Sequence, residues 1–127
     1  MKNNFLPFQI GEQYELWEFD LEVAADRLEG YDSYTFIPSV ESFKLFTTSS
    51  TELIFSLDIL DAVILSFKPP SVLYALRKAL YVNRKALVKE LKDGRNEVSL
   101  IIIKRATSVH LLYGRRNVIQ KLIHTIH

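Results

Sequence analysis

Residues 52–67 read ELIFSLDILDAVILSF, and this stretch decides the class of fold. In 52–58 the apolar side chains alternate with polar ones, which predicts a strand that buries one face, with Leu57 on the buried side. Residues 62–67 are apolar at every position except Ser66. A short run that is apolar throughout predicts a strand covered on both faces, near the centre of a sheet.

The residues before this stretch also predict strands. Segment 15–23 alternates between large apolar side chains and carboxylates, so we expect a strand with one acidic face in water. Shorter strands are expected over 34–37 and 42–47. The polar cluster at 48–50 predicts a turn, and with it a hairpin made of 42–47 and 52–58.

The residues after it change character. Two prolines end the strands, and leucines at helical spacing predict a helix over 71–93. Asn83 interrupts that apolar stripe, so either the helix bends there or Asn83 bonds a buried polar group. A hairpin of 97–103 and 109–113 follows, and a last helix is expected from about residue 116.

This order of elements predicts an α+β fold, with a mainly antiparallel sheet and the two helices of the C-terminal half packed on one of its faces. The whole chain, 1–127, is expected to form one domain, with a strand-rich part at 1–68 and a helix-hairpin-helix part at 69–127.

Composition excludes several classes of protein. With no cysteine, the chain has no disulfide, zinc–thiolate or iron–sulfur site. No glycine-rich phosphate loop, serine-nucleophile elbow or zinc-protease motif occurs, so we expect no enzyme activity, cofactor or metal. No apolar run is long enough to cross a membrane, so a cytoplasmic location without membrane contact is expected. His110 is either a core residue or a functional one.

Charge is sorted along the chain, although the net charge is only +1. Residues 1–66 hold three basic and twelve acidic side chains, a net charge of −9. Residues 67–127 hold thirteen basic and three acidic ones, a net charge of +10. Either the two halves neutralise each other inside one fold, or they leave charged surfaces for a partner.

The acidic half predicts a surface that binds a protein, because carboxylates steer association with cationic partners and aromatic side chains supply much of the energy of interfaces. The residues expected to bind the partner are Tyr14, Glu15, Glu18, Asp20, Glu22, Asp26, Tyr31, Asp32 and Tyr34.

The helix over 71–93 offers an alternative site, because a row of cations with an exposed tyrosine can bind phosphates and stack on a base. The residues of this alternative nucleic-acid site are Arg77, Lys78, Tyr81, Arg84, Lys85, Lys89 and Lys92. An ordinary solvated helix face and an acidic protein partner are the other interpretations of the same pattern.

Residues 10–68, and above all YELWEFDLEV at 14–23 and ELIFSLDILDAVILSFK at 52–68, resemble the acidic, aromatic and strand-rich openings of small bacterial toxin-immunity proteins of the contact-dependent growth inhibition type. The resemblance implies a cytoplasmic, non-catalytic inhibitor that binds one cognate toxin, often a nuclease, and covers its active site. It transfers no particular site residue to this chain.

Overall fold

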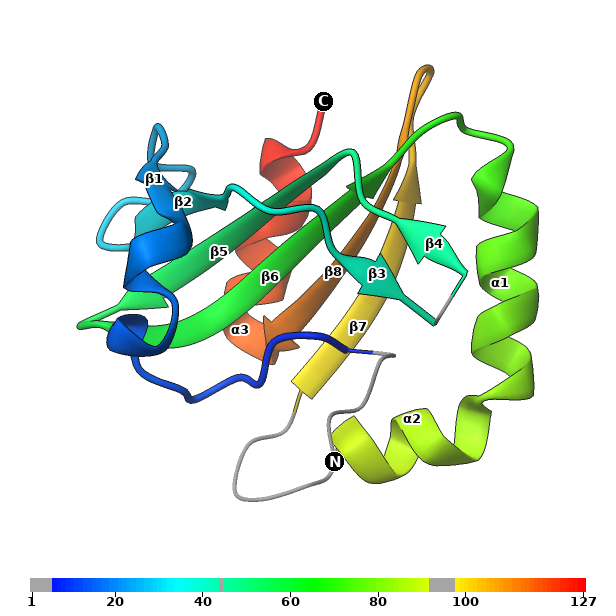
Figure 1. Cartoon of the computed structure of the whole chain (residues 1–127), viewed down its shortest axis with the longest axis horizontal. Helices are drawn as coiled ribbons and strands as arrows, with labels where there is room; N and C mark the ends of the chain where they lie inside the picture. The colour runs from blue at the N-terminus through cyan, green and yellow to red at the C-terminus, as the bar shows by residue number, and fades with distance from the viewer. Residues whose placement is uncertain (1–5, 44, 92–97) are drawn as a thin grey trace.

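The computed structural model describes residues 6–43, 45–91 and 98–127. Within them, six strands pair antiparallel in one sheet, and two very short strands form a ribbon beside it (Figure 1). The sheet runs in the order β1 (Leu21–Val23), β2 (Asp32–Phe36), β5 (Ser50–Ser56), β6 (Ile59–Phe67), β8 (Val109–Arg115), β7 (Val98–Lys104), and the ribbon pairs β3 (Glu41–Ser42) with β4 (Phe46–Thr47). The helices are η1 (Tyr14–Leu16), η2 (Glu18–Asp20), α1 (Val72–Val82), α2 (Arg84–Leu91), α3 (Arg116–Leu122) and η3 (Ile123–Thr125).

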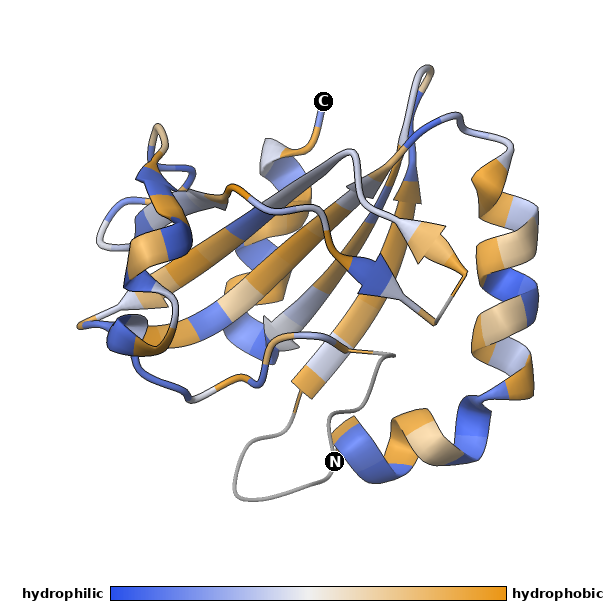
Figure 2. Cartoon of the chain, in the orientation of Figure 1, coloured by the Kyte–Doolittle hydropathy of each residue, from blue (hydrophilic) through white to orange (hydrophobic). Residues whose placement is uncertain are grey.

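Strand β6 lies at the centre of the sheet, as its sequence predicts. It pairs with β5 on one side and β8 on the other, and every residue from Leu60 to Phe67 is buried. Figure 2 shows the apolar residues concentrated along β6 and β7. The predicted α+β class with an antiparallel sheet is confirmed, and so are the C-terminal hairpin, now β7 and β8, and the last helix, now α3.

The predicted hairpin of 42–47 with 52–58 is wrong. Residues 41–42 pair with 46–47 as the β3–β4 ribbon, while β5 pairs with β2 and β6. The turn from β5 to β6 places Leu57 and Asp58 at positive φ, 50° and 66°. Two successive residues at positive φ give the tight turn that joins antiparallel strands, but Asn-Gly or Asp-Gly is its usual sequence. Leu57 is therefore exposed at the tip of this turn. The alternation predicted that it would face the core, and that prediction is wrong.

The strand predicted over 15–23 is reduced to β1 at its end, because residues 14–20 form the single turns η1 and η2. Backbone bonds from Gly11 N to Leu60 O (2.9 Å) and from Tyr14 N to Asp58 O (2.8 Å) attach this segment to the end of the β5–β6 hairpin. Tyr14 and Trp17, three residues apart, then both pack on Phe55. A spacing of three is helical, so burying these two rings favours turns over an extended strand.

The helices cover both faces of the sheet, whereas one face was expected. Leu76 and Leu87 of α1 and α2 belong to a core that also holds Phe55 and Tyr113. Val118 and Leu122 of α3 belong to a second core, which forms behind the sheet (Figure 1). Because β6 and β8 are apolar on both faces, each face needs its own cover. On the first face, Phe8 of the N-terminal segment and Val40 before β3 share this cover with α1 and α2.

The helix predicted over 71–93 is divided at Asn83 into α1 and α2. Both expected consequences of a polar residue at this position occur together: the helix breaks, and the Asn83 side-chain amide donates to the Ala79 carbonyl at 2.7 Å. The predicted end of the helix near Asp93 lies outside the described residues. None of the described helices has the length and apolar character needed to span a membrane.

Candidate binding surfaces of opposite charge

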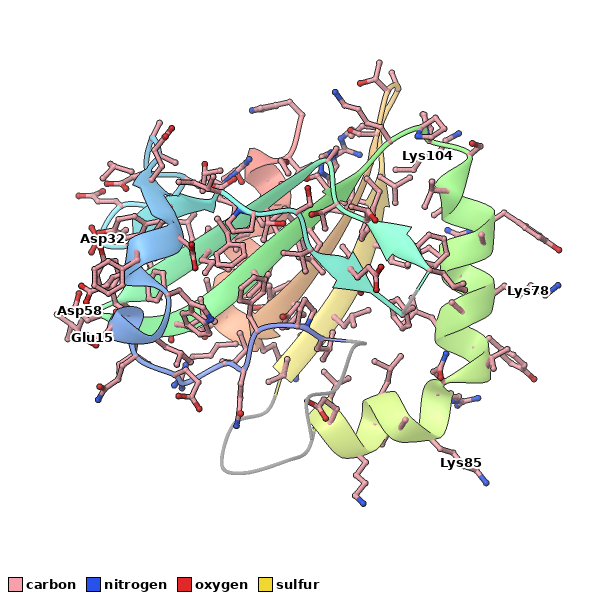
Figure 3. All side chains as sticks on the ribbon, in the orientation of Figure 1. Glu15, Asp32, Asp58, Lys78, Lys85 and Lys104 are labelled. Carbon is pink, nitrogen blue, oxygen red and sulfur yellow. The ribbon has the colours of Figure 1, made fainter. Side chains whose placement is uncertain are left out.

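One end of the molecule carries the carboxylates that the sequence singles out. All six of them are exposed, and they lie on η1, η2, β1, the β1–β2 connection and the start of β2. Asp58, in the β5–β6 turn, joins them, because its carbonyl accepts the Tyr14 backbone N–H. Figure 3 shows Glu15, Asp32 and Asp58 at this same end. We call this surface the acidic face: Glu15, Glu18, Asp20, Glu22, Asp26, Asp32 and Asp58.

The carboxylates of the acidic face form no ion pair among the described residues. Two ion pairs occur among the described residues, Arg27 with Glu52 and Arg115 with Asp61, each at 2.7 Å. Neither Glu52 nor Asp61 belongs to the acidic face. The expected alternative, mutual neutralisation of the two halves, is thus limited in the described residues to a single cross-half pair, Arg115 with Asp61.

Asp61 is an example of a carboxylate that is paired inside the fold. Its side chain is only 10% exposed, and the Arg115 Nε donates to its Oδ1. Burial raises the pKa of Asp61, and the charge and hydrogen bond of Arg115 offset part of that rise. A buried carboxylate needs such a partner, whereas an exposed one is hydrated by water. Within the acidic face, Asp26 Oδ1 accepts the Ser33 backbone N–H at 3.1 Å. The other carboxylates form no hydrogen bond or ion pair among the described residues and keep their charge for other molecules.

Aromatic rings lie directly beneath the acidic face. The ring of Phe55 packs against Tyr14 and Tyr34, each 5.6 Å away between centroids, and against Trp17 at 6.2 Å. Tyr14 and Tyr34 also contact each other at 5.2 Å. These edge-on and tilted contacts are the favourable geometry for aromatic pairs. The cluster supports the short turns η1 and η2, which would have little stability alone.

The Tyr34 phenol reports the negative charge above this cluster. Burial raises its pKa, and nearby Tyr14 raises it further. The carboxylates of Asp32, Asp58 and Asp26 each add to the rise, because a neighbouring negative charge disfavours the phenolate. These three carboxylates come from the β1–β2 connection, the start of β2 and the β5–β6 turn, and all of them raise the pKa of this one phenol.

The three tyrosines expected to contact the partner instead pack against other side chains of the same chain. Tyr14 and Tyr34 are half-buried in the aromatic cluster, and Tyr31 packs against the core under α3. Exposed apolar side chains take the place of these tyrosines: Phe19 is 93% exposed between Glu18 and Asp20. Leu16 (62%), Val23 (79%) and Leu57 (92%) are exposed at the same end. The sequence did not indicate Phe19 as exposed, because the alternation over 15–23 predicts that it faces the buried side of a strand.

The opposite end of the molecule carries the cations of α1 and α2. Of the residues named for the alternative site, Lys92 lies outside the described residues, and the others are all exposed. Figure 3 shows Lys78 and Lys85 pointing outward at this end. Tyr81 is 76% exposed, and so is Tyr74, which lies seven residues earlier on α1 and was not among the predicted site residues. We call this surface the basic face: Tyr74, Arg77, Lys78, Tyr81, Arg84, Lys85 and Lys89.

His110 lies in β8 with both ring nitrogens bonded to serine hydroxyls. Ser66 Oγ is 2.7 Å from Nδ1, and Ser108 Oγ is 2.9 Å from Nε2. Burial lowers the pKa of His110, and the cations Arg27 and Arg105 lower it further. Among the described residues, both ring nitrogens have serine partners and neither has a carboxylate partner, so the arrangement is that of a satisfied, half-buried histidine. In the described parts of the chain, no three potential metal-ligand side chains gather.

No protein-family model matches the chain, and searches of curated proteins and of solved structures find no significant match. The two charged surfaces are therefore the observations from which a function is inferred.

Proposed function

We propose that this protein is a non-catalytic, cytoplasmic inhibitor that binds one cationic protein through its acidic face. The partner we propose is a bacterial toxin domain, for instance a nuclease, whose active site the inhibitor covers. The observation that carries this proposal is the acidic face itself: its exposed carboxylates form no ion pair among the described residues, and the exposed Phe19 lies between two of them, Glu18 and Asp20, in the chain.

Electrostatics supports a cationic partner. A cleft that binds a phosphate backbone is lined by cations, and a patch of carboxylates presents such a cleft with the charge pattern of its substrate. Opposite charges of this kind raise the rate of encounter and exclude partners of the wrong sign. Asp20 and Asp32 supply such charge from two different segments, η2 and β2, so the patch extends over more than one element of the fold.

The apolar side chains supply the second ingredient of a protein interface. Phe19 is almost fully exposed, and Leu57 is 92% exposed at the tip of the β5–β6 turn. Exposing such side chains to water is unfavourable unless a partner buries them, and aromatic residues with a charged surround are typical of interface hot spots. The aromatic cluster beneath them holds the surface in one conformation, which lowers the entropy lost on binding.

Charge reversal tests the role of the carboxylates. The variant Glu18→Lys/Asp20→Lys/Glu22→Lys should fold normally, because all three side chains are exposed, and should lose its partner. The measurement is affinity capture from source cells with the wild-type and variant chains, identification of any captured protein, and an assay of that protein's toxic activity with the purified chain added. Capture that survives the reversal, or a captured protein whose activity is not inhibited, would contradict the proposal.

A matched control isolates position from net charge. Asp20→Lys and Glu41→Lys change the charge equally, but Glu41 lies on β3, which is separate from η1, η2 and β1 (Figure 1). We expect the association rate to fall by about tenfold or more for Asp20→Lys only. Phe19→Ala should leave the association rate nearly unchanged and weaken affinity by about 30-fold through faster dissociation. Equal effects of Asp20→Lys and Glu41→Lys would show that only net charge matters.

A further inference from the structure

The outer side of α1 combines aromatic rings and cations in one stripe. Tyr74, Lys78 and Tyr81 are separated by four and three residues, a spacing that puts them on the same side of a helix. Both tyrosines are 76% exposed, and no ring contact of either is found among the described residues. Seven residues of helix separate the two rings by roughly 10 Å along the axis.

Helix α1 carries no carboxylate, and the described residues of α2 include one, Glu90, near its end. Between Asp61 and Glu90 the sequence contains six basic side chains and no acidic one. Solvated helix faces usually mix both signs, because pairs of opposite charge four residues apart stabilise the helix and keep the surface soluble. The described cations of this segment also form no ion pair. A stripe without anions leaves like charges unrelieved, and a polyanion bound there would relieve them.

The leucines of the same helices pack toward the core, whereas Val82 and Val88 are exposed. Leu76 of α1 and Leu87 of α2 are buried in the core. These leucines attach the helices to the rest of the fold, and the cations of the basic face lie on the opposite side of the helices. A helix that inserts into a lipid surface needs its apolar side free. This arrangement disfavours a membrane surface and favours a ligand that contacts cations and rings together.

We propose that the basic face binds single-stranded nucleic acid without sequence preference. The backbone phosphates would contact Arg77, Lys78, Arg84, Lys85 and Lys89, and bases would stack on Tyr74 and Tyr81. Every base has a face on which an aromatic ring stacks, so this mode tolerates any sequence, and the cations make it strongly dependent on salt. This activity is separate from the acidic face and does not rest on the inhibitor proposal.

The first test measures the binding of fluorescent oligo(U) and oligo(dT) to the full chain by anisotropy, at salt concentrations between about 50 and 200 mM. We expect binding at low salt that weakens steeply as salt rises, and weaker binding to a duplex of equal length, whose bases are not free to stack. The two oligomers distinguish RNA from DNA as the preferred strand. No binding at the lowest salt, or equal binding to duplex, would overturn the proposal.

Variants separate stacking from charge. Tyr74→Ala and Tyr81→Ala should each weaken binding by about tenfold with an unchanged salt slope, because each removes one stacking platform. Lys78→Gln with Lys85→Gln should reduce the slope by about two. Lys104→Gln is the matched control, since this exposed lysine ends β7 outside the basic face, and it should have a much smaller effect. Thermal unfolding of each variant checks that its fold is intact.

Two further outcomes would assign the basic face to another partner. Polyglutamate that competes as well as oligo(U), with no loss in the tyrosine variants, would indicate an acidic protein. Association of the chain with itself that disappears in both Lys78→Gln and Asp20→Lys would indicate that one copy's acidic face occupies another's basic face. Asp20→Lys should otherwise leave nucleic-acid binding intact, so failure here and failure of the inhibitor proposal are distinguishable.

Discussion

The acidic face and the basic face lie at opposite ends of one small molecule, but they are built differently (Figure 3). The acidic face is carried by single turns, loops and strand ends, and its shape depends on rings packed beneath it. The basic face is carried by regular helices, whose backbone hydrogen bonds are made within each helix. The core holds these helices in place through their buried leucines. The acidic and basic halves of the sequence therefore form separate surfaces, one built on loops over packed rings and the other on regular helices.

The junction between these regions is the strand pair β6–β8, which joins the acidic half of the chain to the basic half. Gly114 of β8 lies opposite Ala62, and a Cβ at this glycine would meet the Ala62 Cα at 2.6 Å and overlap the Asp61 carbonyl. We predict that Gly114→Ala lowers the free energy of unfolding by more than about 4 kcal/mol, because backbone atoms would have to move. This is the largest effect that we expect.

Denaturant unfolding measures this effect, and Gly30→Ala is its control. Gly30 also has positive φ, +85°, but its Cβ would meet nothing within 4 Å. Its substitution should cost only about 1 kcal/mol, from the conformation alone. Similar losses for both variants would mean that the close approach at Gly114 is relieved easily and that the junction is not rigid.

Truncating a core side chain beneath one end should destabilise that end without destabilising the other. Phe55→Ala removes the ring that supports Tyr14 and Tyr34, and should cost about 4 kcal/mol. Leu76→Ala removes a fully buried anchor of α1 and should cost about 3 kcal/mol. Amide hydrogen exchange should accelerate mainly in 14–36 for the first variant and in 72–91 for the second. Equal acceleration at both ends in either variant would show that the two ends are energetically coupled.

The carboxylates should divide into a structural class and a free class. Arg27 donates to Glu52 at 2.7 Å and to the Thr125 carbonyl at 3.0 Å, both partly buried. We expect Arg27→Ala to cost about 2 kcal/mol and Glu52→Gln about 1 kcal/mol. Glu22→Gln should leave the urea midpoint unchanged, because this exposed carboxylate has no ion-pair partner among the described residues. A destabilised Glu22→Gln would contradict the free state of the acidic face.

His110 gives the smallest effect, at a site that belongs to neither face. Because its pKa is lowered in the folded state, the unfolded chain binds a proton at higher pH than the folded chain does. Stability should therefore fall as pH decreases below the ordinary value of 6.5, until the folded state also takes up the proton. In His110→Gln this part of the pH dependence of urea unfolding should be absent. An unchanged pH profile would show that His110 does not titrate differently on folding.

Much of the fold follows from local pattern. Residues 62–67 have no polar face, so they had to be covered on both sides, and they occupy the centre of the sheet. The break at Asn83 follows from a polar side chain on an apolar stripe. The hairpin partner of β5 could not be predicted, because Leu57-Asp58 lacks the glycine that normally marks such a turn.

The candidate sites were predicted in part. Charge and helical spacing locate most of the basic face, and Tyr74 could have been found from its distance of seven residues to Tyr81. Phe19 could not be found from alternation, because alternation assumes an extended chain. Tyr14 and Trp17 bury themselves on Phe55 through turns, and this contact between distant segments turns Phe19 outward.

The sequence alone determined the class of fold, the central strand and the separation of charge, because each follows from the period of apolar residues or from a count of side chains. The tertiary structure decided which charges remain free, which rings are exposed and which face each helix covers. Those properties depend on contacts between segments far apart in the chain, such as Asp61 with Arg115, and no local pattern encodes their geometry.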